Sequence, residues 1–398
     1  MGEALQIAIL GSRGIPAEYG GAETLAEELS QKLIQMGFEV YVTCESRGFH
    51  RDNYNGVIRI HNPSTQGKTI TVPTIKDILA TFHLLLRYPR IRLLYYTVPH
   101  AALAAVIPRL LRKKVIINAD GIEWKRMVIR RQYFSTGWKL ISVLAAWYLR
   151  WMEWLVVKVS HAVVADSREI KAYLEQSYKA KNVVYISYGA RELLHSHIPA
   201  ERERGVLEGF GLSMGEYYLT VGRIVAENNI HIEIEGFKRA SSSKHIVIVG
   251  NFNEKDKYTS HLLTLRDNDS KIKFLNPIYD KEVLGILRKN CYAYIHAYEV
   301  GGTNPSLLEQ MLFGRPIIAY DVPFHREVLQ GSGIYFEAED DLARCIDTLE
   351  NGAVDLKEIA RRQARRIEEE YNWDSVAEKY DSLLKALLQE STGGCYGP

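Results

Sequence analysis

Cysteine is scarce in this sequence. The four cysteines, Cys44, Cys291, Cys345 and Cys395, lie far apart and form neither a CxxC pair nor a metal-ligand spacing. Their positions exclude a disulfide framework and argue against a structural zinc site, which favours a reducing, cytoplasmic location. The start, MGEALQIAILGSRG, lacks the basic segment and the long apolar run of a signal peptide. We interpret it as a first strand.

A strong net charge is also missing, because the formal charge of the 398 residues is only +2. The distribution is nevertheless uneven. Residues 1–200 carry 26 Lys and Arg against 16 Asp and Glu, whereas residues 201–398 carry 24 against 32. Within 84–158 there are 14 basic and 3 acidic side chains. This basic region favours an anionic partner.

The order of apolar runs predicts the architecture. Short β-rich runs such as QIAIL, EVYVTC, LLYYTV and KVIINAD alternate with helical segments, and a second series follows with YYLTVGR, HIVIVG, CYAYIHA and RPIIAY. This alternation is typical of α/β proteins with doubly wound parallel sheets. We expect two Rossmann-like domains facing a central cleft: residues 1–195, residues 196–370, and a C-terminal helix with a flexible tail, 371–398, packing back on the first domain. The polar segment 194–216 is the expected linker.

Ligands of open α/β sheets bind beyond the carboxyl ends of the strands, so the loops there are the candidates for a site. In the first, GSRGIPAEYGGAETL, Gly20 and Gly21 precede a helix with Glu23 in its first turn. Free amides at such a helix start can meet a phosphate or a sugar hydroxyl, and packing alone is the alternative explanation of the glycines. The dinucleotide fingerprint GxGxxG is absent.

The second loop, NADGIEWKR, places Asp120 and Glu123 after a strand and adds Trp124, on which a sugar ring can stack. A helix-capping role for Asp120 is an equally good interpretation.

The third and fourth loops belong to the second series of strands. In VGRIVAENN, Arg223 directly follows a strand and Gly222, where its guanidinium can bind a diphosphate; a surface ion pair is the more common role of a lone arginine. In EVGGTNPSLLEQM, two glycines precede a capped helix start, an arrangement suited to an anion. Either Thr303 or Asn304 can be the cap. Glu309, one turn further, can accept the hydroxyls of a ribose.

Together these four loops resemble the GT-B glycosyltransferases, specifically the retaining family 4 of "glycosyl transferases group 1" and its branch of bacterial β-1,4-rhamnosyltransferases. The resemblance covers nearly the whole chain and implies an N-terminal acceptor domain and a C-terminal donor domain. It implies catalytic roles for Asp120 and Arg223. The donor-binding residues would be Gly20, Gly21, Arg223, Asn228, Gly301, Gly302, Thr303, Asn304 and Glu309. The acceptor-binding residues would be Tyr19, Glu23, Glu123, Trp124 and Arg126.

The sequence departs from the family pattern in two places. Asn228 stands where family members commonly have a lysine, and Glu299 is not at the spacing of the first family glutamate. The resemblance implies transfer of L-rhamnose from dTDP-rhamnose, with retention, to a lipid-linked saccharide, and a UDP- or GDP-linked sugar is the alternative donor. Neither a metal nor a further cofactor is expected. We interpret DND at 267–269 as a turn rather than a manganese motif.

The segment KLISVLAAWYLRWMEWLVVK, 139–158, predicts a helix with one narrow polar side. Lys139, Ser142, Arg150 and Glu153 share that side, and the rest is apolar and rich in tryptophan. Such a helix is either buried or lies in a membrane surface; the charges interrupt it before it could span a bilayer. We expect peripheral contact of residues 124–158 with the inner face of the cell membrane, and no nucleic-acid partner.

Other classes of function remain open. A non-hydrolysing sugar-nucleotide epimerase has the same two-domain fold, and an NAD-dependent oxidoreductase has two Rossmann-like domains. A non-catalytic carbohydrate-binding homologue is suggested by Asn228. A nucleic-acid binder could use the basic region and would show a steep salt dependence.

Overall fold

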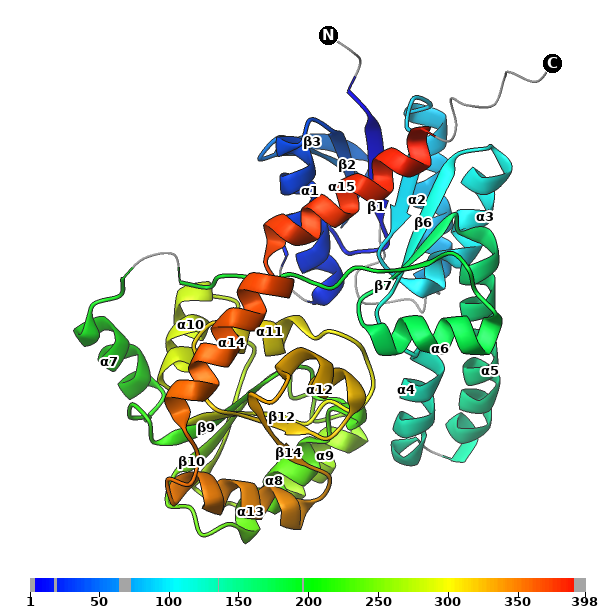
Figure 1. The fold of residues 1–398 in the computed structure, drawn as a ribbon. Helices are drawn as coiled ribbons and strands as arrows, with labels where there is room; N and C mark the ends of the chain where they lie inside the picture. The colour runs from blue at the N-terminus through cyan, green and yellow to red at the C-terminus, as the bar shows by residue number, and fades with distance from the viewer. Residues whose placement is uncertain (1–3, 18–19, 64–72, 135, 195–196, 390–398) are drawn as a thin grey trace, which may run out of the picture. The chain divides into compact units, whose positions relative to one another are not determined.

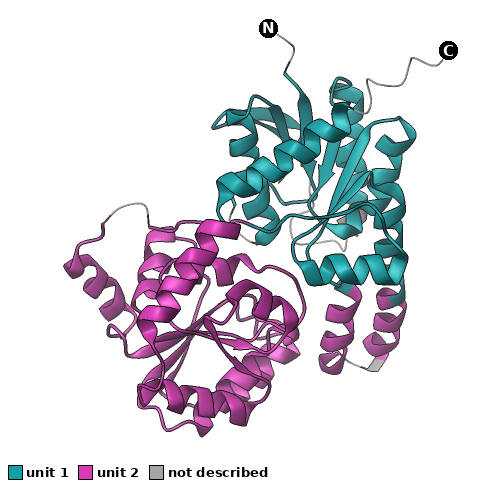
Figure 2. Cartoon of the chain, viewed as in Figure 1, with its two compact units in different colours: residues 1–123, 147–188, 372–398 teal, residues 124–146, 189–371 magenta. Residues whose placement is uncertain are grey.

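The computed structural model describes residues 4–17, 20–63, 73–134, 136–194 and 197–389. The chain forms two compact units (Figure 2). Unit 1 comprises residues 1–123, 147–188 and 372–398, and unit 2 comprises residues 124–146 and 189–371. The sequence placed the first boundary at 195/196 and did not predict that residues 124–146 group with unit 2.

Unit 1 is built on an eight-stranded sheet in the order β3-β4-β2-β1-β5-β6-β7-β8. All neighbouring strands pair in parallel except β3, which pairs antiparallel with β4 as an edge hairpin that the sequence analysis missed. The strands are β1 Gln6–Leu10, β2 Glu39–Ser46, β3 His50–Tyr54, β4 Val57–Pro63, β5 Leu93–Tyr96, β6 Lys114–Ala119, β7 Ala162–Ala165 and β8 Val183–Tyr185. The helices are α1 Gly21–Gln35, α2 Pro73–Arg87, η1 Pro99–Ala101, α3 Ala102–Leu110, the second part of α5 Thr136–Val159, α6 Arg168–Tyr178 and α15 Trp373–Gln389.

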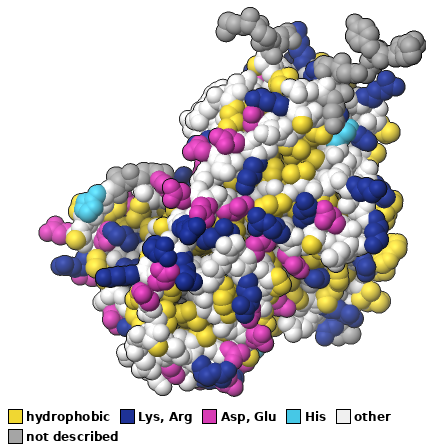
Figure 3. Space-filling model, viewed as in Figure 1, with side chains coloured by type: hydrophobic (Ala, Val, Ile, Leu, Met, Phe, Trp, Pro, Cys, Tyr) yellow, Lys and Arg dark blue, Asp and Glu magenta, His cyan; other side chains and the backbone are white. Residues whose placement is uncertain are grey.

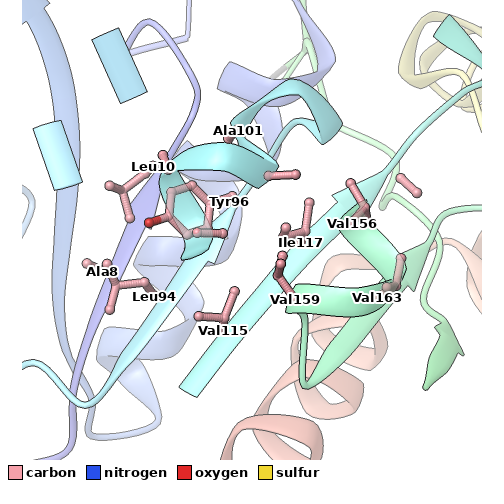
Figure 4. Close-up of a cluster of buried hydrophobic side chains, with 14 of the residues drawn as sticks. Ala8, Leu10, Leu94, Tyr96, Ala101, Val115, Ile117, Val156, Val159 and Val163 are labelled. Atoms are coloured by element: carbon pink, nitrogen blue, oxygen red, sulfur yellow. The ribbon is translucent and has the colours of Figure 1, made fainter. Parts of the chain in front are cut away.

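The core of unit 1 is made where helices cover these strands. Leu94 and Tyr96 of β5 lie in one cluster with Val115 and Ile117 of β6 and with Val156 of α5 (Figure 4). All five side chains are almost fully buried. The near-continuous apolar strands therefore serve a sheet that is covered on both faces, as the sequence pattern predicted.

Unit 2 has a six-stranded parallel sheet in the order β11-β10-β9-β12-β13-β14. Its strands are β9 Tyr217–Val221, β10 His245–Val249, β11 Ile272–Leu275, β12 Ala293–His296, β13 Ile317–Tyr320 and β14 Gly333–Phe336. Its helices are α4 Glu123–Arg130, η2 Arg131–Tyr133, the first part of α5, α7 Ala200–Gly209, η3 Ala226–Asn228, α8 Ile230–Arg239, α9 Lys257–Arg266, α10 Lys281–Asn290, α11 Pro305–Met311, α12 Pro323–Leu329, α13 Glu339–Glu350 and α14 Leu356–Glu370. The predicted pair of Rossmann-like parallel-sheet domains is thus confirmed.

Two details of the connections differ from the sequence prediction or extend it. The expected linker contains a regular helix, α7, which belongs to unit 2. The C-terminal helix α15 belongs to unit 1 and lies beside α1 (Figure 1). The Lys32 ammonium of α1 pairs with the Asp374 carboxylate of α15 at 2.5 Å, and the buried Tyr95 and Tyr380 hydroxyls are 2.9 Å apart.

Helix α5 buries only part of its predicted polar side, because Lys139 and Arg150 are exposed. Ser142 and Glu153 are buried, and the Glu153 carboxylate accepts hydrogen bonds from the Tyr173 and Tyr178 hydroxyls at 2.7 and 2.5 Å. Trp147 is 73% exposed, and six further apolar side chains of the helix are at least 41% exposed: Trp138, Leu140, Ile141, Val143, Leu144 and Trp154. By length and composition, 137–159 could cross a membrane, but the buried Met152 and Val156 make its second part a core element of unit 1.

Candidate functional site

The two loops of the second strand series that the sequence singled out lie side by side. Strands β9 and β12 are paired in parallel, so their carboxyl ends, and the loops 222–229 and 297–304 that follow, share one edge of the unit 2 sheet (Figure 1). The loops are also bonded to each other. The Glu299 amide donates to the Glu227 carbonyl at 2.9 Å, and the Asn229 side-chain amide donates to the Ala297 carbonyl at 3.2 Å.

The first of these loops presents Arg223. Its side chain is exposed, while its carbonyl accepts from the Val225 amide and from the Asn228 side-chain nitrogen, the latter at 2.7 Å. The Oδ1 of Asn228 is buried and has no hydrogen-bond partner among the described residues. The loop therefore carries an exposed guanidinium on Arg223 and, five residues later, a buried acceptor on Asn228. Hydrogen bonds to the Arg223 carbonyl hold the loop in this conformation.

In the second loop, glycine is required at position 301 for a steric reason. A Cβ atom on Gly301 would lie 2.4 Å from the Tyr298 ring. Asn304 is the N-cap of α11, since its Oδ1 accepts from the Ser306 amide at 2.9 Å, and Pro305 occupies the first helical position. Of the two predicted caps, Asn304 is the one observed, and Thr303 is buried beside it.

Glu309 is held by a residue that the sequence analysis missed. The Nη2 of Arg288, in α10, donates to Glu309 Oε2 at 3.1 Å and to the Ser306 hydroxyl at 2.7 Å. The Arg288 side chain is only 1% exposed and that of Glu309 is 12% exposed. The carboxylate is thus oriented before any ligand arrives. The sequence around Arg288, GILRKN, is typical of a helix end and does not indicate that this arginine is buried.

Helix α4 supplies two arginines to the same loops. Arg126 is buried; its Nη2 donates to the Tyr298 hydroxyl at 2.6 Å and its Nε to the Val300 carbonyl at 3.4 Å. Arg130 forms an ion pair with Glu227, with Nε 2.9 Å from Oε2. The two arginines therefore support both strand-end loops of unit 2. The acceptor contact expected of Arg126 stays a prediction.

Glu227 is ionised in these surroundings. Its side chain is fully buried, and burial alone raises the pKa of its carboxyl group. The hydrogen bonds and the charge of Arg130 outweigh that effect and hold the pKa of Glu227 below its usual value. The pair is a fixed part of the loop, and Glu227 is a second residue of this region that the sequence analysis passed over.

In unit 1, carboxylates of α1 hold the glycine-rich segment that follows β1. Gly20 is the N-cap of α1, and Glu23 in its first turn is buried, with Oε1 accepting from the Arg13 amide at 3.0 Å. Glu27, one turn on, accepts from the Ala17 amide at 3.0 Å. The glycine-rich segment is therefore attached to α1 by two carboxylates, of which the sequence analysis identified one. Tyr19 lies outside the described residues.

Asp120 follows β6 of unit 1 and is partly buried, and Glu123 begins α4. Burial, followed by the charge of Asp120, raises the pKa of Tyr188, whose hydroxyl also accepts from the Asn118 side chain at 3.2 Å. Trp124 is partly buried. The structure thus brings together the predicted residues of the two strand-end loops within unit 2, and Gly20 with Glu23 at the start of α1 within unit 1.

The residues 267–269 form a turn, as predicted. Asp267 and Asn268 adopt left-handed backbone conformations at the end of α9. One group of metal-ligand type occurs among the described residues, His50, Asp52 and His61 on the β3–β4 hairpin. Its carboxylate is already paired with Arg59 through bonds of 2.7 and 2.6 Å, and it contains none of the predicted site residues.

Two protein families match the sequence. Residues 210–370 match the family described as "Glycosyl transferases group 1", and residues 4–191 match one described as "Domain of unknown function (DUF1972)". A search of curated proteins found no match. The first of these matches spans the strand-end loops of unit 2 that carry Arg223, Asn304 and Glu309.

Solved structures of the same two-domain fold cover almost the whole chain. Sucrose-phosphate synthase from Thermosynechococcus elongatus has a TM-score of 0.79 at 16% identity, covering 97% of this chain and 100% of its own. A glycosyltransferase from Rickettsia africae gives 0.71 at 14%, covering 97% and 99%. HepE of Anabaena, solved with UDP-glucose, gives 0.70 at 14%, covering 96% and 100%. These likenesses show the two-domain GT-B fold.

Proposed function

We propose that this chain, a GT-B fold with a glycosyl transferases group 1 domain in unit 2, moves a sugar from a nucleotide-diphosphate donor to a hydroxyl group of a saccharide. One observation carries the proposal. The loops after β9 and β12 share a sheet edge, are hydrogen-bonded to each other, and offer an exposed Arg223, a capped helix start and an oriented Glu309. HepE, which has the same fold, was solved with UDP and with UDP-glucose.

Each of these groups suits one part of such a donor. The Arg223 guanidinium and the amides of the Gly301–Asn304 segment bind the diphosphate and stabilise the charge that develops on it as the sugar leaves. Glu309, oriented by Arg288, accepts hydrogen bonds from the ribose hydroxyls. Asn228 adds a hydrogen-bond acceptor, and Gly20 and Gly21 add backbone amides.

The reaction we propose retains the configuration of the transferred sugar. The bond between the sugar carbon and the phosphate oxygen breaks first, and the acceptor oxygen attacks on the same face. The departing phosphate oxygen takes the proton of that hydroxyl, so no protein nucleophile and no metal is needed. Asp120 orients the sugar and stabilises its positive charge, while Glu23, Glu123, Trp124 and Tyr19 bind the acceptor.

The donor we propose is dTDP-L-rhamnose, with a UDP- or GDP-linked sugar as the alternative. Support comes from the sequence motifs around Asp120 and Glu309, which resemble the rhamnosyltransferase branch. The acceptor we propose is a lipid-linked saccharide at the inner face of the cell membrane. The outward apolar face of α5 supports this location, because exposed tryptophan and leucine side chains suit a bilayer interface.

Nucleotide binding by the purified protein tests the core of the proposal. The shift in melting temperature is measured with dTDP, UDP, GDP and NAD, since a ligand that binds only the folded state raises that temperature. We expect one of the nucleoside diphosphates to stabilise the protein. Arg223→Ala and Glu309→Gln should weaken its binding roughly tenfold each, a loss of about 1.4 kcal/mol per contact. Glutamine is chosen at 309 because it can still accept a bond from Arg288.

Matched controls are Arg239→Ala and Glu235→Gln of α8, an exposed and a partly buried residue away from the strand-end loops, which should bind the nucleotide as the parent does. Stabilisation by NAD alone would identify an oxidoreductase and overturn the proposal. Conversion of a nucleotide sugar without any acceptor would identify an epimerase, and binding without conversion in the presence of acceptor would identify a non-catalytic homologue. If transfer occurs, the anomeric configuration of the product, measured by NMR, tests retention.

A further inference from the structure

Unit 1 has an exposed apolar surface that the sequence analysis did not identify. On α2, Ile75, Leu79, Phe82 and Leu86 are 47%, 59%, 47% and 82% exposed. Their spacing of four, three and four residues places them on one side of the helix. The opposite side of α2 carries Ala80 and Leu84 into the core of the unit. The four exposed apolar residues therefore do not belong to the side of α2 that packs into the core.

The end of α3 continues this surface. Leu110 and Leu111 are 77% and 57% exposed. Helices α2 and α3 pack against each other, and the segments that follow them are joined, because the Lys114 amide donates to the Arg92 carbonyl at 2.9 Å and the Lys113 ammonium donates to the Pro89 carbonyl at 2.5 Å. We call the six exposed side chains the α2–α3 surface: Ile75, Leu79, Phe82, Leu86, Leu110 and Leu111. Clusters of exposed apolar side chains of this size mark interaction sites.

The charged residues in the part of the sequence that forms the α2–α3 surface are almost all positive. Residues 75–114 contain eight Lys and Arg, and their single acidic residue, Asp77, is buried. Lys76 is paired with Glu45, whereas Arg87 and Arg112 follow the apolar residues of α2 and α3 and are exposed. Figure 3 shows Lys and Arg side chains interspersed with hydrophobic ones along the edge of unit 1 over α3.

We infer that the α2–α3 surface of unit 1 docks on an anionic lipid bilayer, with its apolar side chains in the interface and the arginines beside them at the phosphates. An apolar helix face flanked by arginine is the arrangement that binds such interfaces. A second copy of the chain is a poorer occupant, since a symmetric contact would set the same basic residues opposite one another. The inference extends the membrane contact of the proposed function to a second site, away from α5 in sequence.

The experiment is flotation of the full-length protein with vesicles of phosphatidylcholine, alone or mixed with phosphatidylglycerol. The test variant Leu79→Gln/Leu86→Gln should bind the mixed vesicles at least about tenfold more weakly than the parent, because two apolar side chains no longer enter the interface. The charge variant Arg87→Gln/Arg112→Gln should lose roughly tenfold or more on mixed vesicles and little on phosphatidylcholine alone. The control Leu356→Gln/Tyr279→Gln removes exposed apolar groups from unit 2 and should bind as the parent does.

Two results would overturn the inference. Unchanged binding of Leu79→Gln/Leu86→Gln, with a loss in Trp147→Gln/Trp154→Gln, would assign the membrane contact to α5 alone. A parent dimer that becomes a monomer on Leu79→Gln/Leu86→Gln substitution, measured by analytical ultracentrifugation, would identify the surface as an interface between copies. Circular dichroism and the melting temperature without ligand show whether each variant is folded. Vesicle binding requires no nucleotide-sugar donor. The vesicle experiment therefore tests this inference even if no nucleotide binds to the protein.

Discussion

Helices α4 and α5 follow each other in the basic region of the sequence, yet the structure uses them in opposite ways. The arginines of α4 point to buried partners, with Arg126 at Tyr298 and Arg130 at Glu227. On α5, Ser142 and Glu153 also face inward, whereas its tryptophans, two of its leucines and the basic residues Lys139 and Arg150 are exposed. Charge density along a sequence therefore does not locate a charged surface. Whether a charged side chain contributes to the surface depends on whether it pairs with a buried group.

The largest expected loss of stability comes from removing the ion pair between Arg130 of α4 and Glu227. Arg130→Met leaves the Glu227 carboxylate buried without its cation, and we expect the free energy of unfolding to fall by about 2–3 kcal/mol. The loss should stay below that of a fully buried pair, because the Arg130 side chain is 34% exposed. Urea denaturation measures it.

Arg131→Met is the matched control, since Arg131 is exposed, and it should stay within about 0.5 kcal/mol of the parent. The double variant Arg130→Met/Glu227→Met removes both charges and should recover most of the lost stability. Equal losses in Arg130→Met and Arg131→Met would mean that the ion pair does not support the loop.

Arg126→Met should have a smaller effect, about 1–2 kcal/mol, through the loss of its hydrogen bonds to two neutral groups, the Tyr298 hydroxyl and the Val300 carbonyl. Tyr298 also packs against Gly301, so we expect the KM for the nucleotide donor to rise more than kcat falls. Lys125→Met, on the exposed side of α4, is the control for both measurements. A change in stability with an unchanged KM would limit Arg126 to a structural role.

Much of the unit 2 site could be predicted because its signals are local. A strand followed by glycine and Arg223, and the Asn304-Pro305 helix start, are each contained in a few residues. Arg288 and Glu309 are 21 residues apart, and Arg130 and Glu227 are 97 apart. Such pairs depend on how the helices pack, which no short motif encodes.

The same reasoning applies to the fold. The alternating strands gave a clear period and were predicted, whereas the β3–β4 hairpin was missed because its first strand, HRDNY, is polar and lies at the sheet edge. On α5, the sequence analysis grouped four residues on one polar side, but the structure buries Ser142 and Glu153 and exposes Lys139 and Arg150. Hydrophobic periodicity does not say which side of a helix faces the protein. The hydrogen bonds from Tyr173 and Tyr178 to Glu153 settle that for the second part of the helix.

The buried glutamates Glu227 and Glu153 make the stability of the protein depend on pH in opposite directions. The pKa of Glu227 is lowered, so its contribution to stability is present above the unfolded value of about 4.5 and is lost as the pH falls. The pKa of Glu153 is raised, mainly by burial, so its contribution is present below that value and is lost as the pH rises.

Urea unfolding across a pH series measures both contributions. Glu227→Gln should remove part of the parent's loss of stability on the acid side, and Glu153→Gln should remove part of the decline above the unfolded carboxyl pKa. If Glu153→Gln left the decline above the unfolded carboxyl pKa as steep as in the parent, the buried position of the Glu153 carboxylate would be contradicted.

The smallest effect on stability, and the clearest on binding, is expected for Trp147→Gln on α5. The side chain is 73% exposed, so the free energy of unfolding should change by less than about 0.5 kcal/mol. An indole that leaves water for the bilayer interface contributes to binding without contributing to the fold, so vesicle affinity should fall severalfold. The opposite pattern, a destabilised protein with unchanged vesicle affinity, would mean that this face packs on protein, and α5 would then resemble α4 rather than contrast with it.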